Sequence, residues 1–518
     1  RIFIEELKKS IPRVLSLIDT DKTSVSYGLG DRNFWAWGLT DFGNATFQGC
    51  AHGLSRLWVQ GLWPYDSDQK LFIKRIQSLF LGAKFLTRAD GSLEEAFPNE
   101  GSYCVTALVA FDSLITIDLI SNRMSDLQRE ECIEIVRPWI NFLMQSDETH
   151  AIISNHLATA VAALVRWNHL MDDPNALRMA ELLLERILSN QSEEGWFREY
   201  EGADPGYQTL CLHYLADVHL QKRELNLLEP IAKSIRFLQY FAHPDGSFGG
   251  HYGSRCTRFY YPSGILAMAP EIPEAASLAY YMQNSIAENR VVTLSSMDEP
   301  NLVPMFNSYA WGASLSQDDR NEIDKLNPEP LPFEREHPFR KSFSQAGLIV
   351  DRGQDHYSII NFKKGGVTYH FVGNKLKTLD CGTVIESPSG ILGSNHFYDM
   401  KQSVSIQNNR IIIRHRISEM PKKLTFPFKF LILRILCLTI FRISCLREIT
   451  KALLVKYLIT NPKLWRIWNE RKILLGENLK IIDLLDSVDG YRKVDNNEPF
   501  VPIHMASQGY WHLQDEKR

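Results

Sequence analysis

The sequence lacks several features that would place it in a common class of protein at once. Its eight cysteines form no CxxC pair and have no regular spacing, which argues against a structural zinc site and a disulfide framework. The net charge of −4 is small for 518 residues and does not indicate a nucleic-acid binder that depends on bulk charge. No signal peptide is visible, and the chain begins at Arg1 rather than Met. What remains is an ordinary globular composition in a chain long enough for more than one core.

Short turn motifs recur along the first half of the chain, each after an apolar helical pattern. They are centred on Gly91, Gly195 and Gly246, and the first interval of 104 residues is about twice the second, of 51. The doubled interval predicts a further turn near residue 147. Stepping the same period outward reaches Gly43 and Asp298. The period predicts six units of about 50 residues.

Each unit is expected to be two helices joined by a polar turn at one common edge. Hairpins stacked in this way bury a shared core between neighbours. Six of them closing on themselves would form a ring with a cleft at one rim. We therefore predict an N-terminal (α/α)6-type toroid over residues 1–325.

After a proline-rich linker at 327–332 the pattern changes to the alternation of strands. It is visible in four segments: 346–351, 357–362, 367–371 and 402–407. In 410–417, Ile411, Ile413 and Ile417 fall on one face and Arg410, Arg414 and Arg416 on the other, as in a half-buried strand. Residues 326–518 are therefore expected to form an antiparallel, sandwich-like β-sheet domain. The fold class predicted is α+β multidomain, toroid first and sheet second.

A basic and apolar insertion at about 420–476 interrupts this second domain. From Lys422 to Lys472 it carries twelve basic residues and two acids, interleaved with large apolar residues. Its apolar run at 431–440 contains Arg434 and is too short to span a bilayer. Two hypotheses stay open: an interfacial segment that contacts an anionic membrane, and a helical insertion that packs on the protein. Only the first predicts a location, peripheral to a membrane.

Polar and aromatic residues gather where the second helix of units three, four and five begins. Because a ring places equivalent positions of neighbouring units side by side, these clusters can converge on one cleft. Aromatic residues, at 11% of the chain, would suit a sugar-binding cleft, although larger cores explain them equally well. The clusters are Asn155-His156, 198–207 and 251–262.

Two of these motifs resemble the heparinase II/III-like and alginate-lyase group: Asn155-His156 in the third hairpin, and Asp204-Pro205-Gly206-Tyr207 after a Gly-Trp-Phe turn in the fourth. The resemblance implies a toroid followed by an antiparallel sheet domain, and cleavage of uronate-containing polysaccharide. It implies that Asn155, His156 and Tyr207 are active-site residues. It also implies a histidine from the sheet domain, for which His370 is the nearest candidate. The family's stretch is richer in histidine and carries an acid, so His370 departs from the pattern. We expect no cofactor and no metal.

The chemistry of such a lyase explains why these residue types are needed. The enzyme removes the proton at C5, next to a carboxylate, and expels the oxygen at C4. Asn155, with His156 or Arg255, would hold the carboxylate and the charge that develops on it. Tyr207 would serve as base or acid if nearby cations lowered its pKa from about 10. Further substrate contacts are expected from Tyr200, His251, Tyr252, Arg258 and His370.

Two other functions are compatible with the sequence. One is a glycoside hydrolase on the same toroid, working with two carboxylates, for which the turns offer Asp41, Asp90, Asp204 and Asp245. The other is a non-catalytic, membrane-associated protein of polysaccharide assembly. Structural roles are also open for the predicted site: Asn155 as a helix cap, His156 and Tyr207 as packed residues, and Arg255 as a partner of Asp204 or Glu201.

Overall fold

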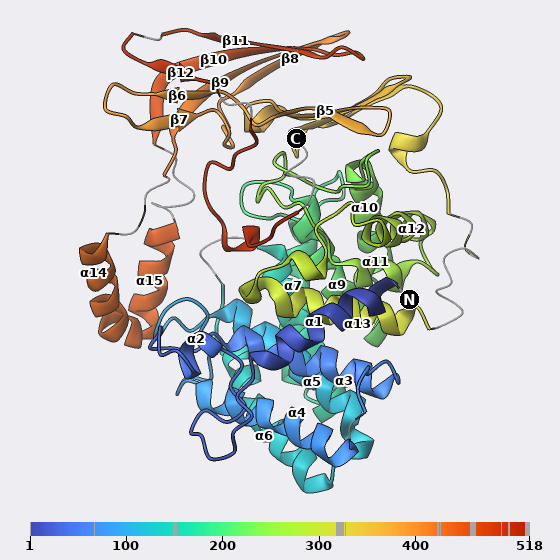
Figure 1. The fold of residues 1–518 in the computed structure, drawn as a ribbon, viewed down its shortest axis with the longest axis vertical. Helices are drawn as coiled ribbons and strands as arrows, with labels where there is room; N and C mark the ends of the chain where they lie inside the picture. The colour runs from blue at the N-terminus through green and yellow to red at the C-terminus, as the bar shows by residue number, and fades with distance from the viewer. Residues whose placement is uncertain are drawn as a thin grey trace.

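The computed structural model describes residues 2–66, 68–148, 153–317, 326, 328–421, 424, 426–455, 463–487, 489–495 and 498–512. A helical domain occupies one end of the molecule and two layers of β-sheet cover the other end (Figure 1). This is the predicted α+β order, toroid first and sheets second. The predicted domain boundary at 325 falls among residues 318–325, outside the described residues.

Six inner helices form a closed ring. Each contacts the next one along the chain, and the last contacts the first. This closure confirms the predicted toroid. The inner helices are α3 (Cys50–Val59), α5 (Tyr103–Ile120), α7 (Ser154–Met171), α9 (Pro205–Gln221), α11 (Pro262–Met268) and α13 (Glu299–Leu315).

An outer layer of helices covers the ring. Five of them follow an inner helix in sequence: α4 (Gln69–Leu86), α6 (Asp126–Gln145), α8 (Pro174–Ser189), α10 (Leu228–Leu238) and α12 (Pro273–Ala287). The sixth is α1 (Ile2–Ser16), which packs on α13 and so completes the last hairpin with the first helix of the chain. Inner helix α5 is long and apolar enough to cross a membrane, but most of it is buried in the ring.

The six turns share one rim, because each leads from an outer helix into an inner one. Side-chain caps begin several inner helices: Ser102 caps α5, Asp204 caps α9 and Asp298 caps α13. At the fourth turn Gly195 has φ +101°, and a Cβ there would lie 2.3 Å from the carbonyl oxygen of Lys233 in α10. Only glycine allows the turn to approach the next outer helix this closely.

Two antiparallel sheets follow. The first has the order β1-β2-β3-β4-β5, and the second the order β11-β10-β9-β7-β6-β12, with β8 paired to β9. The strands of the first are β1 (Phe339–Phe343), β2 (Leu348–Arg352), β3 (His356–Asn361), β4 (Val367–Val372) and β5 (Lys375–Asp380). Those of the second are β6 (Val384–Glu386), β7 (Leu392–Ser394), β8 (Ser403–Gln407), β9 (Arg410–Glu419), β10 (Leu464–Leu474), β11 (Lys480–Leu485) and β12 (Arg492–Val494).

The three central strands of the first sheet, β2, β3 and β4, are buried on both faces, which explains their apolar residues. One face belongs to the toroid core through residues such as Tyr357 and Tyr369. The other face packs Ile349 and Ile360 against Ile411 of the second sheet. The predicted alternation in 410–417 is confirmed, because Ile411, Ile413 and Ile417 are each buried, whereas Arg410 and Arg414 are exposed. The sheets therefore form the predicted sandwich, laid on the rim of the ring.

The basic insertion is shorter than the sequence suggested. Its described helices are α14 (Pro427–Leu438) and α15 (Ser444–Val455), and from Leu464 onward the chain forms β10. Arg471 is buried in that strand, 2.8 Å from Asp483 and 2.6 Å from Asp380. Alternate burial along β10 places Ile467, Asn469, Arg471 and Ile473 inside the sandwich. Lys422, Lys423 and Lys456 lie outside the described residues.

A buried polar network links the inner helices. Arg166 of α7 forms two hydrogen bonds with Asp217 of α9, at 2.8 and 2.5 Å. His52 of α3 lies 2.8 Å from Asp112 of α5 and accepts a hydrogen bond from Arg56. Burial raises the pKa of Asp112 and lowers that of His52. These contacts connect neighbouring hairpins where an unpaired charge would be costly.

Removing one partner of this network should destabilise the whole ring. Asp217→Ala leaves the buried guanidinium of Arg166 without its bidentate acceptor, so we expect a loss of about 3 to 5 kcal/mol in the free energy of unfolding. The matched control is Glu134→Ala, which removes the exposed ion pair with Arg137 and should cost at most about 1 kcal/mol. Urea unfolding measures both. Equal losses in the two variants would contradict a structural role for the buried pair.

Candidate active site

The third and fourth hairpins meet at the rim through a short backbone bridge. Ile153 pairs with Glu199, and the hydroxyl of Ser154 donates to the carbonyl of Arg198 at 2.7 Å. These bonds place the start of α7 beside the loop that leads into α9. Asn155, the second residue of α7, therefore lies next to Glu199.

Glu199 is the centre of the cluster, and the sequence interpretation had not singled it out. Its Oε1 accepts a hydrogen bond from Asn155 Nδ2 at 2.5 Å and one from Arg255 Nη1 at 3.1 Å. The residue is buried, and burial raises its pKa to about 7 against the opposing effects of Arg255 and His156. Two predicted donors thus already converge on one carboxylate. The structural alternative for Arg255 was an ion pair with Asp204 or Glu201; its guanidinium pairs with Glu199 instead.

Arg255 also lies against two tyrosine rings. Its guanidinium carbon is 3.6 Å from the ring centre of Tyr207 and 5.4 Å from that of Tyr200. Asp204 sets this geometry: its Oδ1 accepts from the backbone N–H of Tyr207 at 3.0 Å, and its Oδ2 from that of Arg255 at 2.8 Å. One carboxylate therefore positions residues of the fourth and fifth hairpins together.

The protonation state of Tyr207 differs from the expectation. A role as base required that neighbouring cations lower its pKa. Burial instead raises the pKa of Tyr207 above its ordinary value, and the favourable field of Arg255 offsets this only in part. The phenol is therefore protonated near neutral pH and is suited to donating a proton.

His156 lies at the edge of the cluster and faces a cavity. Its Nδ1 is 3.0 Å from both carboxylate oxygens of Glu148. Burial alone would lower its pKa, but Cys104 and Glu148 raise the pKa of His156 well above its ordinary value. A cationic imidazole therefore lines the cavity, which measures about 690 Å³ and lies between the toroid and α15.

Arg255 and Tyr200 line a second, smaller cavity of about 90 Å³. Its other walls come from the sheet domain, including Lys364, His396 and Tyr398, and from the C-terminal segment, including Gln508. Asn155 and Glu199 line neither cavity, but Glu199 is bonded to Arg255 of the smaller one, and Asn155 is next in sequence to His156 of the larger one. The site thus sits where toroid, sheet and C-terminal segment meet.

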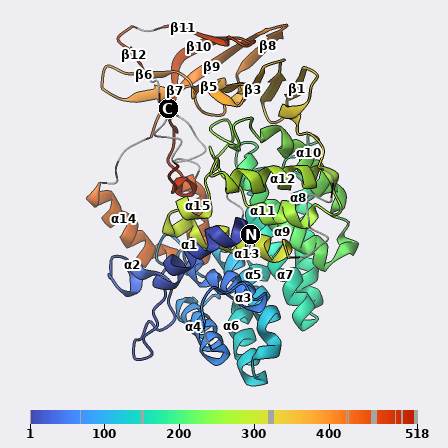
Figure 2. The same cartoon turned by 45° about the vertical axis from the view of Figure 1, so that its right-hand side comes forward.

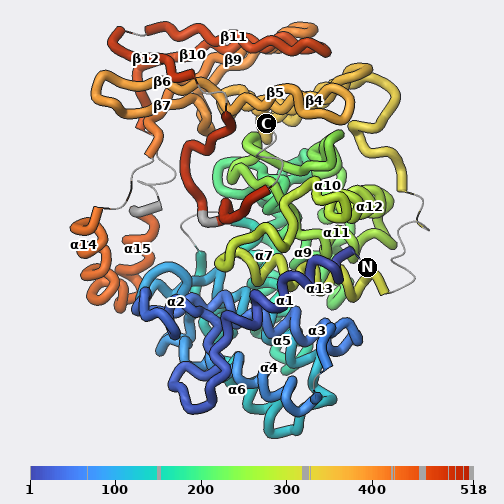
Figure 3. Tube along the Cα trace, in the orientation of Figure 1, coloured from blue at the N-terminus to red at the C-terminus, as the bar shows by residue number. Residues whose placement is uncertain are grey.

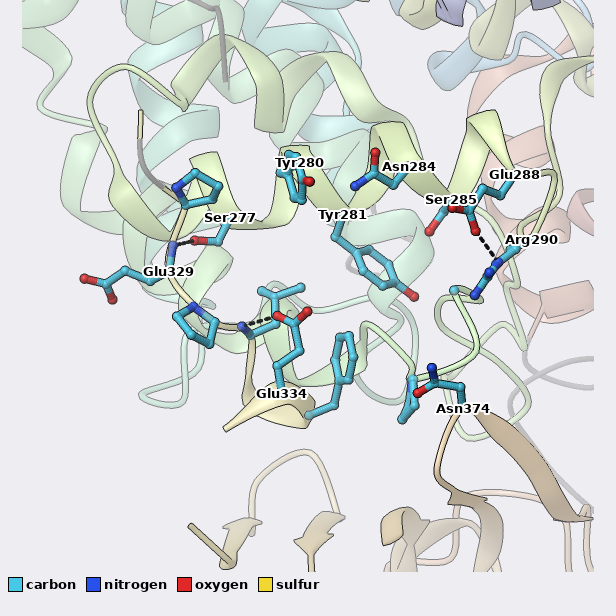
Figure 4. Close-up of a pocket in the computed structure, with 16 residues that line it drawn as sticks. Ser277, Tyr280, Tyr281, Asn284, Ser285, Glu288, Arg290, Glu329, Glu334 and Asn374 are labelled. Atoms are coloured by element: carbon cyan, nitrogen blue, oxygen red, sulfur yellow. Dashed lines mark hydrogen bonds and ion pairs between the residues drawn. The ribbon is translucent and has the colours of Figure 1, made fainter. Parts of the chain in front are cut away.

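A third cavity, of about 640 Å³, lies away from these residues (Figure 4). It is bordered by α12, the linker and the turn after β4. Glu329 and Glu334 face it, together with the ion pair between Glu288 and Arg290. None of the residues predicted for the site lines it. We therefore place the candidate site at the first two cavities.

The histidine from the sheet domain is not the one expected. His370 of β4 bonds to Ser358 and to the carbonyl of Glu477, both in the sheets. Its neighbour Tyr369 points the other way, to the toroid, with its hydroxyl 2.6 Å from His251 Nδ1. Alternation along the strand therefore turns His370 away from the site. His396, after β7, lines the second cavity instead, and its Nε2 lies 3.1 Å from the carbonyl of His251.

The remaining predicted residues hold the domains together. Tyr252 is fully buried, and its hydroxyl bonds to His243 at 2.8 Å. His251 binds Tyr369, and Arg258 lies 5.9 Å from the ring centre of Tyr510 in the C-terminal segment. Thus Asn155, His156, Tyr207, Arg255 and Tyr200 gather around Glu199, whereas His251, Tyr252 and Arg258 contact the domains that cover it.

Two further contributions had no sequence signal. The buried ammonium of Lys364 donates to the carbonyls of His251 and Gly253, at 3.0 and 2.6 Å, and so fixes the loop that carries Arg255. The C-terminal segment runs back from the sheets to the toroid (Figure 3), where Gln508 donates to the carbonyl of Arg255. Among the described residues, no group of three or more His, Cys, Asp or Glu is placed to hold a metal ion.

Comparison with known proteins finds similarity only among solved structures. No family model and no curated protein matches the chain. The structure is similar to xanthan lyase from Paenibacillus, with a TM-score of 0.47 and 9% identity over 81% of this chain and 45% of that one. It is similar to heparinase III with a TM-score of 0.47 and 10% identity over 93% of this chain and 77% of that one. It is also similar to chondroitin AC lyase from Streptomyces coelicolor A3, solved with chondroitin sulphate. There the TM-score is 0.46 and the identity 9%, and the match covers 81% of this chain and 66% of that one. The chain thus spans less than half of the xanthan lyase and just under two thirds of the chondroitin lyase.

A structure described as a glycoside hydrolase is similar at a TM-score of 0.37 and 9% identity. At these identities the similarity concerns the fold.

The raised pKa of Glu199 predicts how stability responds to pH. The ionised form is disfavoured only in the folded state, so the contribution of this group to stability is full below the unfolded pKa of 4.5 and is lost as pH rises through a pKa of about 7. Glu199→Gln keeps an acceptor and cannot ionise. Its stability relative to wild type should therefore increase by about 3 kcal/mol between pH 4.5 and pH 8.

Urea unfolding at several pH values measures this difference. The matched control is Glu201→Gln, two residues away on an exposed carboxylate, which should show no such trend. A stability difference for Glu199→Gln that stays constant with pH would contradict a raised pKa.

Proposed function

We propose that this protein is a polysaccharide lyase of the heparinase II/III-like type, which cleaves uronate-containing polysaccharide by β-elimination. The observation that carries the proposal is the convergence of Asn155 and Arg255 on one carboxylate, beside the phenol of Tyr207. An amide and a guanidinium that hold the carboxylate of Glu199 have the chemistry to hold that of a uronate. These donors become more important as charge develops on the substrate in the transition state.

The protonation states of the cluster divide the two proton transfers between residues. Tyr207, whose pKa is raised, would protonate the leaving oxygen at C4. Glu199, with a pKa of about 7, would take the proton from C5. Both of its side-chain hydrogen bonds fall on Oε1, so Oε2 is the oxygen assigned to accept the proton. The base then lies beside the donors that hold the adjacent carboxylate, where C5 of a uronate would be.

Substrate contacts outside the cluster follow from the cavities. The cationic ring of His156 borders the larger cavity and would attract an acidic polymer. Tyr200 borders the smaller one and offers a ring face to a sugar. An acidic polysaccharide or oligosaccharide is therefore the proposed partner.

The hydrolase alternative is less well supported, because the four turn acids have structural roles. Asp204 caps α9 and binds the loop at Arg255. Asp90 and Asp245 each accept from a serine two residues later within their turns, and Asp41 pairs with Arg434. A non-catalytic binder is less well supported too, because Asn155, Glu199 and Tyr207 are buried together and do not lie scattered on a shallow surface.

A peripheral location on an anionic membrane completes the proposal. The basic, apolar segment supports it through α14 and α15, whose apolar side chains are largely exposed. Binding to a charged surface of this kind weakens when salt screens the charges.

The lyase mechanism predicts specific losses of turnover. On uronate polymers that yield an unsaturated product, Tyr207→Phe should abolish the rise in absorbance and leave substrate binding nearly intact, because only the proton donor is lost. Asn155→Ala should lower kcat/KM by about 3 kcal/mol in transition-state stabilisation. Glu199→Gln should be folded and inactive, and wild-type activity should rise with pH through about 7 as Glu199 ionises.

Melting curves accompany each assay, so that a loss of activity is separated from a loss of structure. Full turnover in Tyr207→Phe or in Glu199→Gln would contradict the assigned roles. Products without the absorbance of an unsaturated sugar would instead favour hydrolysis.

Membrane binding is tested with vesicles. The full chain should co-sediment with vesicles that contain phosphatidylglycerol, and the bound fraction should fall as salt rises from about 0.1 to about 1 M, because the Debye length shrinks from about 10 to about 3 Å. Vesicles of phosphatidylcholine alone are the control. Equal partition onto the two would exclude the electrostatic contribution.

A further inference from the structure

Helices α14 and α15 stand beside the ring, apart from the sheets to which their ends connect (Figures 1 and 2). Of the residues in α14, Cys437 alone is buried. Large apolar side chains are exposed on both helices, among them Phe428, Leu431 and Ile435 on α14. Contiguous exposed apolar surface on this scale marks a surface that contacts something else.

The inner side of this pair of helices is fixed to the toroid. Arg434 pairs with Asp41 at 3.1 Å, and Asn99 donates to the carbonyl of Cys437 at 3.1 Å. Arg447 is buried beside Asp90, at 3.3 Å. The exposed apolar face is therefore held in a defined direction.

A loop from the opposite end of the sequence extends the same surface. It follows α2 (Arg32–Trp35) and carries Trp37 and Leu39, whose side chains are 66% and 73% exposed. Two residues further on, Asp41 and Phe42 contact Arg434 of α14. The loop thus lies against the helices. Tryptophan is the residue favoured at the boundary between lipid and water.

The charges of the surface favour one kind of partner. Lys429 and Arg442 are exposed, and neither forms an ion pair with any residue that the structure describes. Among the described residues of the two helices, Glu448 is the single acidic residue. Each helix has twelve residues, about 18 Å in length, too short to cross a hydrocarbon core of about 30 Å. Apolar and basic side chains together fit the surface of an anionic bilayer.

The two sides of α15 connect this surface with the candidate site. Ser444, Glu448 and Lys451 lie on one side and line the cavity of about 690 Å³ that His156 borders. Leu446, Ile449 and Leu453 recur at helical spacing on the opposite side and are exposed. One helix, about 10 Å across, separates the exposed face from the cavity.

We infer that α14, α15 and the loop with Trp37 and Leu39 form a single docking surface for an anionic membrane, which holds the cavity one helix diameter from the lipid. The substrate is then an acidic polysaccharide attached to the membrane or lying on it. The identity of the substrate rests on the proposed lyase activity, whereas the docking surface, which deepens the proposed membrane location, does not.

Co-sedimentation with phosphatidylglycerol-containing vesicles tests the docking surface. Trp37→Ala and Ile435→Glu each change an exposed side chain, so melting temperatures should be unchanged, and each should weaken vesicle binding about tenfold. The matched control is Leu127→Glu, an apolar side chain of α6 that is 77% exposed, and it should bind as wild type does. Wild-type binding by both surface variants would overturn the inference. So would a wild-type dimer in light scattering that Ile435→Glu dissociates, because the surface would then be a protein interface.

The substrate part is tested by comparing one uronate polymer free in solution and tethered to the vesicles. The tethered polymer should be cleaved faster by wild type, and Ile435→Glu should lose this advantage while cleaving the free polymer normally. Equal rates on both forms would overturn the membrane-attached substrate. Failure to cleave either form, with vesicle binding intact, would reject the lyase proposal and leave the docking surface standing.

Discussion

The carboxylate of Asp204 is the contact on which the arrangement of the site depends. One oxygen caps α9 at Tyr207, and the other holds the backbone of Arg255 in the next hairpin. Helix caps are common, but this one also joins two units of the ring at the rim. Because both oxygens are used, the phenol and the guanidinium meet at 3.6 Å. The cap is thus a local feature with a long-range consequence.

The first sheet and the C-terminal segment cover the rim of the toroid and hold the loops of the site in place. Lys364 reaches from the first sheet to the loop before Arg255, and Tyr369 reaches to His251. The C-terminal segment adds Gln508 from the far end of the chain. These contacts exclude water from the cluster, and burial in turn raises the pKa of Glu199 and of Tyr207. The proton chemistry proposed for the site therefore depends on the packing of the sheets, although the residues themselves belong to the toroid.

Burial affects the three titratable groups of the cluster differently. Glu199 and Tyr207 are both pushed toward their neutral forms, whereas His156 is kept protonated by Glu148 and Cys104. The cation thus faces the cavity, whereas Glu199 and Tyr207 line neither cavity of the site. An acidic chain entering from that side would meet the positive charge first.

The sequence by itself determined the repeating parts of this protein. A period of about fifty residues identified the hairpins, and alternation identified strands such as β9, because both patterns arise from local geometry. The positions of Asn155 and Tyr207 at the starts of inner helices followed from the same period. Tertiary structure alone decided that α1 packs on α13 to complete the outer layer, that Arg471 lies in a buried strand, and that Glu199 joins Asn155 to Arg255. It also decided that His396 lines the site while His370 faces the other sheet. Each of these depends on which distant segments pack together, and contacts between segments far apart in the chain leave no fixed spacing in the sequence.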